Sequence, residues 1–372
     1  MRIGVPKEIK VHEYRVGLVP ASVRELVAHG HEVFVQSGAA ERIDITDDHY
    51  RRAGATILPD AAEVFAAADL IVKVKEPQAV ERAMLRPGQT LFTYLHLAPD
   101  PEQAKDLMRS GVIAIAYETV TGVRGGLPLL SPMSEIAGRM SIQAGAHCLE
   151  MEQGGRGMLL GGSAGVAPAN VVVIGGGVAG VNAVRMAIGL EAAVTCIDVN
   201  IERLYALDQQ FAASLNTIFS TRQAIEDYVL QADLVIGAVL VPGAAAPKLI
   251  TKELVKEMKR GSVIVDISID QGGFSETSHP TTHANPSYVV DGVVHYCVAN
   301  MPGAVARTST FALNNATLPF VLELANKGTL AALRTDPHLL AGLNVFGGQI
   351  TYPAVAAALG LPYVDPVRAL AA

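Results

Sequence analysis

Cysteine is scarce in this chain, and runs of positive charge are missing. The 372 residues include three cysteines, Cys148, Cys196 and Cys297, which are far apart and form no CxxC pair. This scarcity argues against a disulfide framework or a structural zinc site and favours a reducing, cytoplasmic location. The formal net charge of −7 and the lack of a basic run argue against nucleic acid as a partner.

A membrane signal is also missing. The first residues, "MRIGVPKEIK", are charged and contain no apolar core of a signal peptide. Residues 157–184 carry no charge and are long enough to span a bilayer. However, glycines interrupt this stretch together with Pro168, Asn170 and Asn182. We therefore expect a loop, a strand and a glycine turn here, in a protein with no membrane partner.

The sequence does contain alternating strand-like and helix-like segments. In the first half, "RIGVP", "HEVFVQ", "DLIVKVK", "TLFTYLHL" and "VIAIAYET" are typical of strands, and "PASVRELVAHG" and "DPEQAKDLMRSG" are typical of helices. Strands that alternate with short helices predict an α/β fold with a doubly wound parallel sheet. Half of the residues, 50%, are hydrophobic, which is enough for large cores.

A second α/β series follows a long helical pattern at 131–154 and precedes another at 302–328. We predict strands at 170–174, 193–197, near Ile218, 233–238 and 262–267, and helices at 178–189, 200–211, 221–231 and 251–259. The length suggests two domains. We expect two Rossmann-like doubly wound domains joined by two long helices, with the active site in the cleft between them. The first domain would be split (1–130 and 308–372), and 131–307 would be inserted into it.

The inserted domain contains a dinucleotide-binding pattern. In "VVVIGGGVAG", Gly175, Gly177 and Gly180 have GxGxxG spacing, after an apolar strand and before a helix. Such glycines allow a tight turn, close approach of a pyrophosphate, and close packing of helix on strand. Asp198 ends the next strand, where its carboxylate can accept ribose hydroxyls and would repel a 2′-phosphate, so NAD is favoured over NADP. The alternative is a glycine turn used only for packing.

Four nearby residues have weaker signals. Arg203 either contacts the nucleotide or is a solvated helix residue. For Ser220 we favour N-capping of the helix that follows. Val239 and Leu240 follow a strand, so their backbone could line the cofactor.

Charged groups follow three strands of the first half. Arg15, Lys75 and His96 would meet at one sheet edge if the strands are parallel. A guanidinium suits a carboxylate, although Arg15 alone is as consistent with the surface, and a single histidine is more often a satisfied core residue. Lys73 and Lys75 either lie on the wet face of an edge strand or deliver a cation to a substrate. Past a strand of the second series, Asp266 could cap a turn and Asp270 could act near a nicotinamide.

Taken together, the sequence resembles the alanine dehydrogenase family over nearly its whole length. The resemblance rests on "MRIGVPKEIKVHEYRVGLVP", "VKVKEP", "LHLAPD", "VVVIGGGVAG" with Asp198, "VDISIDQGG" and "NMPGAVARTST". It implies oxidation of L-alanine by NAD to pyruvate and ammonium, the reverse reaction, and a homohexamer. It also implies roles for individual residues: Arg15, Lys75 and Asn300 for the substrate, His96, Asp270 and Lys75 for catalysis, and for NAD Ser134, Gly175, Gly177, Val178, Ala179, Gly180, Asp198, Arg203, Ser220, Val239, Leu240, Ile267, Asp270, Asn300 and Met301.

Two positions depart from the family pattern. His279 stands where some relatives have an arginine, which puts one phosphate contact in doubt. Glu323 is present where some relatives are thought to bind a metal, but Lys327 one turn later cannot be a ligand as a cation. We therefore predict no metal.

Three other functions fit parts of this pattern. One is the NAD(H)-binding subunit of a proton-translocating transhydrogenase, which has a related fold and needs a membrane partner. Another is a saccharopine- or hydroxyacid-type dehydrogenase. The third is an NAD-sensing module that retains the fold without catalysis.

Overall fold

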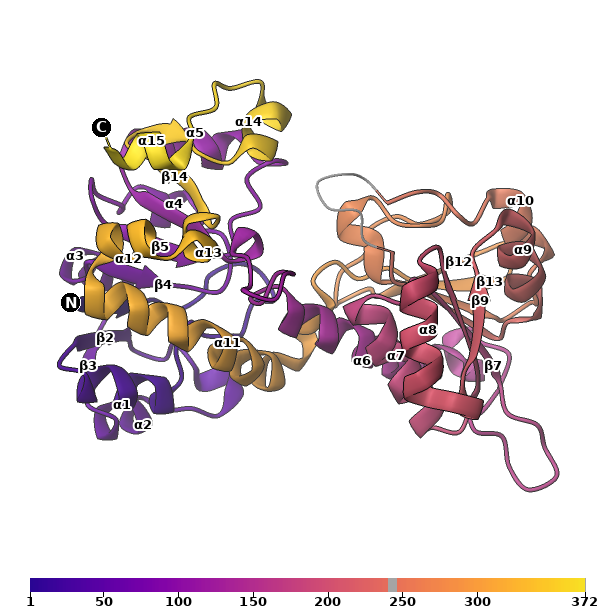
Figure 1. Cartoon of the computed structure of the whole chain (residues 1–372). Coiled ribbons are helices and arrows are strands. Elements are labelled where there is room, and N and C mark those ends of the chain that lie inside the picture. Colours follow the sequence, from indigo (N-terminus) through magenta and orange to yellow (C-terminus); the bar gives the residue numbers. More distant parts are fainter. Residues whose placement is uncertain (240–245, 372) are drawn as a thin grey trace. The chain divides into compact units, whose positions relative to one another are not determined.

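The computed structural model describes residues 1–239 and 246–371, which form two compact units. Unit 1 combines Met1–Met133 with Val305–Ala372, and unit 2 is Ser134–Ala304 (Figure 1). Leu240, expected to line the cofactor, lies outside the described residues.

Unit 1 is built on an eight-stranded sheet with the order β15-β14-β6-β5-β4-β1-β2-β3. Strands β1 to β6 are parallel to one another, and β14 and β15 add an antiparallel edge. Because the strand order reverses between β1 and β4, the sheet is doubly wound with its switch point there. The strands are β1 (Arg2–Val5), β2 (Glu32–Gln36), β3 (Thr56–Leu58), β4 (Leu70–Val72), β5 (Thr90–Thr93), β6 (Ile113–Ala116), β14 (Leu343–Phe346) and β15 (Gln349–Ile350).

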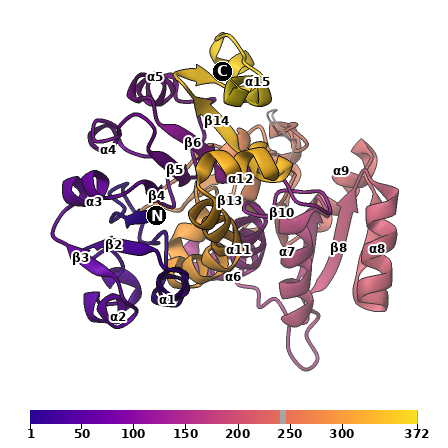
Figure 2. The ribbon, with the colours of Figure 1, turned by 60° about the vertical axis from the view of Figure 1, so that its left-hand side comes forward.

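Helices cover both faces of this sheet. In Figure 2, α3, α4 and α5 lie on one side and α11 and α12 on the other. The helices are α1 (Pro20–Ala28), α2 (Asp47–Arg52), α3 (Ala61–Ala67), α4 (Ala79–Arg82), α5 (Pro101–Ser110), α11 (Ala306–Lys327), α12 (Thr329–Thr335), α13 (Pro337–Leu340), α14 (Pro353–Leu359) and α15 (Pro366–Ala371), with 3-10 turns η1 (Glu41–Ile43) and η2 (Tyr117–Thr119).

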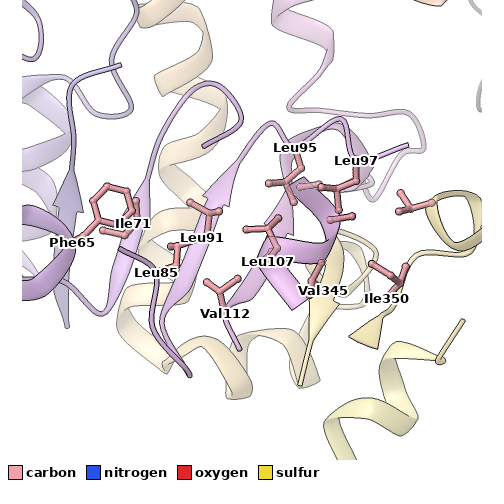
Figure 3. Packing of buried hydrophobic residues seen from close by; sticks show 14 of the residues in the cluster. Phe65, Ile71, Leu85, Leu91, Leu95, Leu97, Leu107, Val112, Val345 and Ile350 are labelled. Atoms are coloured by element: carbon pink, nitrogen blue, oxygen red, sulfur yellow. The ribbon is translucent and has the colours of Figure 1, made fainter. Parts of the chain in front are cut away.

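One core of unit 1 lies between the sheet and helices α3 and α5. Phe65 of α3 and Leu107 of α5 pack against Ile71 and Leu91 of the central strands, and Val345 of β14 extends the cluster (Figure 3). All five side chains are inaccessible to solvent. The C-terminal segment therefore contributes to the same core as the N-terminal strands.

Unit 2 contains a seven-stranded sheet with the order β12-β13-β11-β10-β7-β8-β9. Six strands are parallel, β12 is antiparallel to β13, and the order reverses between β7 and β10. The strands are β7 (Asn170–Ile174), β8 (Ala193–Asp198), β9 (Asn216–Phe219), β10 (Leu234–Gly237), β11 (Val263–Asp266), β12 (Ser287–Val290) and β13 (Val293–Tyr296).

The helices of unit 2 begin where the sequence provides a cap. Asn200, Thr221 and Thr251 each accept a backbone N–H of the following first turn. The helices are α6 (Ser131–Cys148), α7 (Val178–Gly189), α8 (Ile201–Phe211), α9 (Arg222–Gln231) and α10 (Lys252–Glu257), with 3-10 turns η3 (Met151–Gln153), η4 (Ala212–Ser214), η5 (Ile267–Gln271) and η6 (Met301–Val305).

The expected fold class, two doubly wound α/β domains with two long helices, is confirmed. The helical pattern at 131–154 was too long, because α6 ends at Cys148 and the chain folds back: a Cβ on Gly155 would lie 2.3 Å from the Cys148 carbonyl oxygen. The short strands β3, β12, β13, β14 and β15 were not predicted. Among the described helices, none has the length and apolar character needed to cross a membrane.

Candidate functional site

In unit 1, three of the predicted residues follow neighbouring parallel strands. Arg15 lies in the loop after β1, Lys75 after β4 and His96 after β5, and these strands are adjacent in the sheet. The loop after β1 contacts the end of β4, since a Cβ on Gly17 would lie 2.3 Å from the Val72 carbonyl oxygen. Ligands of open α/β sheets bind beyond the carboxyl ends of the strands at the switch point, here between β1 and β4.

Arg15 is not an ordinary surface arginine. It is 2% exposed and forms a bidentate ion pair with Glu13, in which Nε and Nη2 donate to the two carboxylate oxygens at 2.7 and 2.5 Å. The third guanidinium nitrogen, Nη1, lies 3.0 Å from the sulfur of Met133, a weak acceptor. The guanidinium is thus fixed in orientation at the switch point.

The surroundings of Glu13 are strongly cationic. Burial alone would raise the pKa of Glu13, but hydrogen bonds and charge from Arg15, with a contribution from Lys75, hold this pKa below its usual value. Glu13 therefore carries a charge between two cations. Burial also raises the pKa of the nearby Tyr94 hydroxyl, which donates to the Leu129 carbonyl oxygen at 2.5 Å.

Lys75 and Lys73 do not share a wet strand face, so that interpretation was wrong. The strand β4 ends at Val72, although the Lys73 N–H still donates to the Phe92 carbonyl oxygen at 3.2 Å. Lys73 is fully buried, with its ammonium bonded to Glu8 and Glu81 at 3.0 and 2.6 Å. Lys75 is half-buried, and its carbonyl oxygen accepts the Thr93 hydroxyl at 3.0 Å.

His96 is not a core histidine, because its side chain is 44% exposed. Its backbone has a positive φ of 47°, a left-handed conformation that is uncommon outside glycine. The backbone N–H donates to Glu118 at 2.6 Å, and the imidazole stacks on Tyr94 with ring centroids 5.8 Å apart. A carboxylate and an aromatic ring thus hold the imidazole at the sheet edge.

In unit 2, the glycine turn joins β7 to α7. A Cβ on Gly180 would lie 1.7 Å from the Gly175 carbonyl oxygen, and one on Gly175 would lie 2.6 Å from that of Ala238. By contrast, no described atom lies within 4 Å of a Cβ built on Gly177, the residue at the start of α7. Two glycines are therefore required by packing, and the third leaves open space at a helix N-terminus, which fits the approach of a pyrophosphate. The first residues of that helix, Val178 and Ala179, present their N–H groups there.

Asp198 and Arg203 bind to the same turn. Asp198 Oδ2 accepts the Gly176 N–H at 2.6 Å and Oδ1 accepts that of Asn200 at 2.8 Å. Arg203 Nε donates to the Gly176 carbonyl oxygen at 2.5 Å, so this arginine packs on the turn and is more than a solvated helix residue.

The capping role predicted for Ser220 was wrong. The neighbouring Thr221 caps α9 by accepting the Ala224 N–H at 3.0 Å, and Ser220 donates its backbone N–H to the Asp198 carbonyl oxygen. Ser220 therefore lies at the end of β9, directly beside Asp198.

Asp270 is exposed on the 3-10 turn that follows β11. The loop after it is held by Asp266, whose Oδ2 accepts the Phe274 N–H at 3.0 Å, and by Lys248, which donates to the carbonyl oxygens of Gly272, Gly273 and Ser275. Burial raises the pKa of Asp266, although the hydrogen bond from the Phe274 N–H and the charge of Lys248 oppose this effect. Asp266 thus stabilises the turn, as the simpler alternative predicted.

The remaining predicted cofactor contacts lie at ends of elements. The Ser268 hydroxyl donates to the Val239 carbonyl oxygen at 2.7 Å, which joins the ends of β10 and β11, where Ile267 begins the turn. Asn300 has a φ of 60° and precedes Met301, the first residue of η6. Ser134 lies in the first turn of α6.

The two departures from the family pattern have defined surroundings. His279 stacks on Tyr288 with ring centroids 3.7 Å apart. Lys327 forms an ion pair with Glu323 at 2.5 Å on α11. Within residues 1–239 and 246–371, no three His, Cys, Asp or Glu side chains are grouped so as to hold a metal.

Three carboxylates near the predicted cations were not predicted from the sequence. Glu8 and Glu13 lie in the loop after β1, and Glu118 follows β6. The rule that identified Lys75 and His96, a polar residue just beyond a strand, would have found Glu118 in "VIAIAYET". Glu8 and Glu13 have no comparable signal, since acidic residues in a polar loop are usually exposed.

Known proteins resemble this chain over its full length. The N-terminal domain model of the alanine dehydrogenase/PNT family matches residues 4–137, and the C-terminal domain model matches residues 141–353. The alanine dehydrogenase of Halomonas elongata is 61% identical, with 98% of each chain covered, and that of Methanococcus maripaludis is 54% identical, with 100% of each covered.

Two solved structures allow a comparison of folds. An L-alanine dehydrogenase superposes with a TM-score of 0.94 at 52% identity, covering 97% of this chain and 99% of the other. A transhydrogenase from Sinorhizobium meliloti superposes with a TM-score of 0.81 at 26% identity, covering 95% and 100%. The chain belongs to the alanine dehydrogenase/PNT family.

Proposed function

We propose that this chain catalyses the NAD-dependent oxidative deamination of L-alanine to pyruvate and ammonium, and the reverse reductive amination. The observation that carries the proposal is the row of Arg15, Lys75 and His96 beyond adjacent strands at the switch point of unit 1. The glycine turn with Asp198 in unit 2 supplies a matching cofactor site. Full-length relatives above half identity carry the name of this activity.

Unit 1 binds the amino acid or keto acid. Glu13 holds the guanidinium of Arg15 in a fixed orientation, and this guanidinium binds the substrate carboxylate. Lys75 directs its ammonium at the carbonyl oxygen of pyruvate and stabilises the negative charge that develops there. Asn300 is the further residue proposed to contact the substrate.

Unit 2 binds NAD. The turn of Gly175, Gly177 and Gly180 and the start of α7 would hold the pyrophosphate, and Asp198 would accept the ribose hydroxyls. Six further residues are proposed to line the same cofactor: Ser134, Arg203, Ser220, Val239, Ile267 and Met301. When bound, NAD⁺ accepts the α-hydrogen of alanine as a hydride.

His96 and Asp270 move the protons. Alanine reacts as the neutral amine, and loss of hydride leaves an iminium ion. Water adds to this ion and gives up a proton, and the carbinolamine collapses to pyruvate as the nitrogen leaves as ammonia. The exposed imidazole of His96 and the exposed carboxylate of Asp270 are the two groups that exchange these protons with solvent.

The transhydrogenase alternative has weaker support. Identity to the solved transhydrogenase is 26%, against 52% to the solved L-alanine dehydrogenase. A transhydrogenase subunit also has no need for a substrate carboxylate site, whereas Arg15 is buried and fixed in orientation at the switch point. We further propose a cytoplasmic homohexamer, which light scattering of the purified protein would test.

One experiment separates the candidate functions. NADH oxidation is followed with pyruvate, with and without ammonium. Oxidation that requires ammonium is expected for the proposed function. Oxidation without ammonium would indicate a hydroxyacid dehydrogenase. No oxidation in either case, with NADH binding retained, would favour a transhydrogenase subunit or a sensing module.

A further inference from the structure

A buried ion triad is formed around Lys73, two residues before the proposed catalytic Lys75. Lys73 is inaccessible to solvent, and its ammonium donates to Glu8 Oε2 at 3.0 Å and to Glu81 Oε1 at 2.6 Å. Both carboxylates are buried, at 7% and 1% exposure. Nothing in the proposed reaction uses Lys73, and its ammonium is enclosed by these partners.

The two carboxylates of the triad have different second partners. Glu8 Oε1 accepts the backbone N–H groups of Val74 at 2.7 Å and Lys75 at 3.3 Å. Glu81 Oε2 accepts the N–H of Gln78 at 2.7 Å, within its own helix start, and no other N–H among the described residues. Glu8 therefore links the loop after β1 to the backbone of Lys75, and Glu81 does not.

The triad is a poor source of stability. Burial raises the pKa of Glu8, and the charge of Lys73 only partly opposes this effect. Buried ion pairs are often replaced by packed apolar side chains without loss of stability, because desolvation offsets the attraction between the charges. A role in orienting a neighbouring residue would explain why a buried charge is present at this position.

We propose that Glu8 is a positioning residue for the reaction: it fixes the backbone of Lys75 and thereby aims the Lys75 ammonium at the substrate oxygen. The ammonium of Lys73 holds the Glu8 carboxylate in place, and Glu81 serves only to neutralise and orient Lys73. This inference rests on the proposed function. It predicts that loss of Glu8 affects catalysis, whereas loss of Glu81 affects folding alone.

The test compares Glu8→Ala with Glu81→Ala, which each leave Lys73 with one carboxylate. Both should lower the melting temperature. At a temperature where both are folded, Glu8→Ala should lower kcat/KM for pyruvate by at least tenfold, and Glu81→Ala should stay within about twofold of the wild type. Glu8→Gln retains an acceptor oxygen for the two N–H groups and should keep most of the activity.

A second measurement does not depend on turnover. Hydrogen exchange at the amides of Val74 and Lys75 should quicken in Glu8→Ala and remain slow in Glu81→Ala. Equal losses of kcat/KM in the two alanine variants, or unchanged exchange in Glu8→Ala, would overturn the inference. If wild-type protein does not oxidise NADH with pyruvate and ammonium, the proposed function fails, and the exchange result still decides whether Glu8 holds Lys75. If Glu8→Ala does not fold, Glu8→Gln decides. This variant keeps the acceptor oxygen, so a folded Glu8→Gln protein that has lost its activity would overturn the inference.

Discussion

The backbone N–H of His96 donates a 2.6 Å hydrogen bond to the carboxylate of Glu118 at the end of the next strand of the sheet. The same carboxylate accepts the N–H of Leu95, and its Oε1 lies 4.0 Å from Nδ1 of His96. These contacts maintain the positive φ of His96 and leave the imidazole exposed. A histidine in strained backbone, held by a carboxylate, is the arrangement expected of an acid–base group.

His96→Asn should lower the rate of alanine oxidation by about 10²–10⁴-fold, the usual contribution of a general acid–base group. Asparagine tolerates a positive φ, so the melting temperature should stay close to that of the wild type. The pH profile of kcat/KM should lose one ionisation. The pH–rate profile and melting curve of the same preparation check this. Wild-type turnover in a folded variant would remove His96 from the mechanism.

Arg15→Ala should raise KM for pyruvate by about 30-fold or more, because removing one partner of a desolvated charge pair costs about 2–5 kcal/mol. The change also leaves Glu13 buried without its bidentate partner, so stability should fall by about 3–5 kcal/mol. The double variant Glu13→Leu with Arg15→Met should recover most of the stability and none of the affinity. Recovery of pyruvate affinity in the double variant would assign the carboxylate to another residue.

The Glu13–Arg15 pair also predicts acid sensitivity. The pKa of Glu13 in the folded protein is below its unfolded value, so its stabilising contribution is present above about pH 4.3 and is lost as the pH falls through the folded pKa. The melting temperature of the wild type should therefore fall more steeply between about pH 5 and pH 3 than that of the Glu13→Leu/Arg15→Met variant. Asp48→Asn, which breaks an exposed pair with Arg51, is the control and should follow the wild type. Parallel curves for wild type and double variant would contradict the prediction.

The glycines of the nucleotide turn offer a matched pair. Gly180→Ala places a methyl group 1.7 Å from a carbonyl oxygen and should lower the melting temperature. Gly177→Ala meets no described atom within 4 Å, so the apo protein should melt as the wild type does, yet NADH should bind at least about tenfold more weakly because the pyrophosphate needs this space. Melting curves of the apo proteins and calorimetric titration with NADH measure the two effects. Unchanged binding in Gly177→Ala would show that the phosphates lie elsewhere.

Sequence pattern predicted the glycine turn of unit 2 and its flanking elements better than the short edge strands of the same sheet. Strand β7 and helix α7 were predicted at their observed ends, because an apolar strand, a glycine turn and a helix follow each other without interruption. The strands β12 and β13 were missed, since "SYVV" and "VVHY" are short and their pairing is an edge hairpin. The alternation of apolar and polar residues in such short segments is too weak to predict strands that are added at the edge of a sheet.

The predicted roles of single side chains failed where burial depends on distant partners. The role of Lys73 was left open between a wet strand face and a cation for the substrate, but Glu8, 65 positions earlier in the chain, binds its ammonium. Capping was favoured for Ser220 because serine is a preferred N-cap residue, but the structure selects its neighbour Thr221. In both cases the sequence named the right place and the tertiary contacts decided the role.

Cofactor choice should depend on Asp198. Both of its carboxylate oxygens accept backbone N–H groups, from Gly176 and Asn200, and each can accept a further hydrogen bond from a ribose hydroxyl. A 2′-phosphate at the same place would meet its negative charge. Asp198→Asn removes the charge and retains one acceptor oxygen, so the ratio of kcat/KM for NADPH to that for NADH should rise. The melting temperature should fall slightly, because the new NH2 group replaces an oxygen that accepts a backbone N–H. Asp198→Ala should raise the same ratio and also weaken both cofactors, because the glycine turn loses its 2.6 Å hydrogen bond.

Asp227→Asn serves as the control for that experiment. Asp227 lies exposed on α9 in the same unit, hydrogen-bonded to Gln223, so its loss changes the net charge equally without touching the glycine turn. Its cofactor ratio should equal that of the wild type, which separates local repulsion at the ribose from a general effect of net charge. An unchanged ratio in Asp198→Asn, measured by steady-state kinetics with both cofactors, would show that another group excludes the 2′-phosphate. An equal rise in both variants would mean that long-range charge, rather than Asp198, sets the preference.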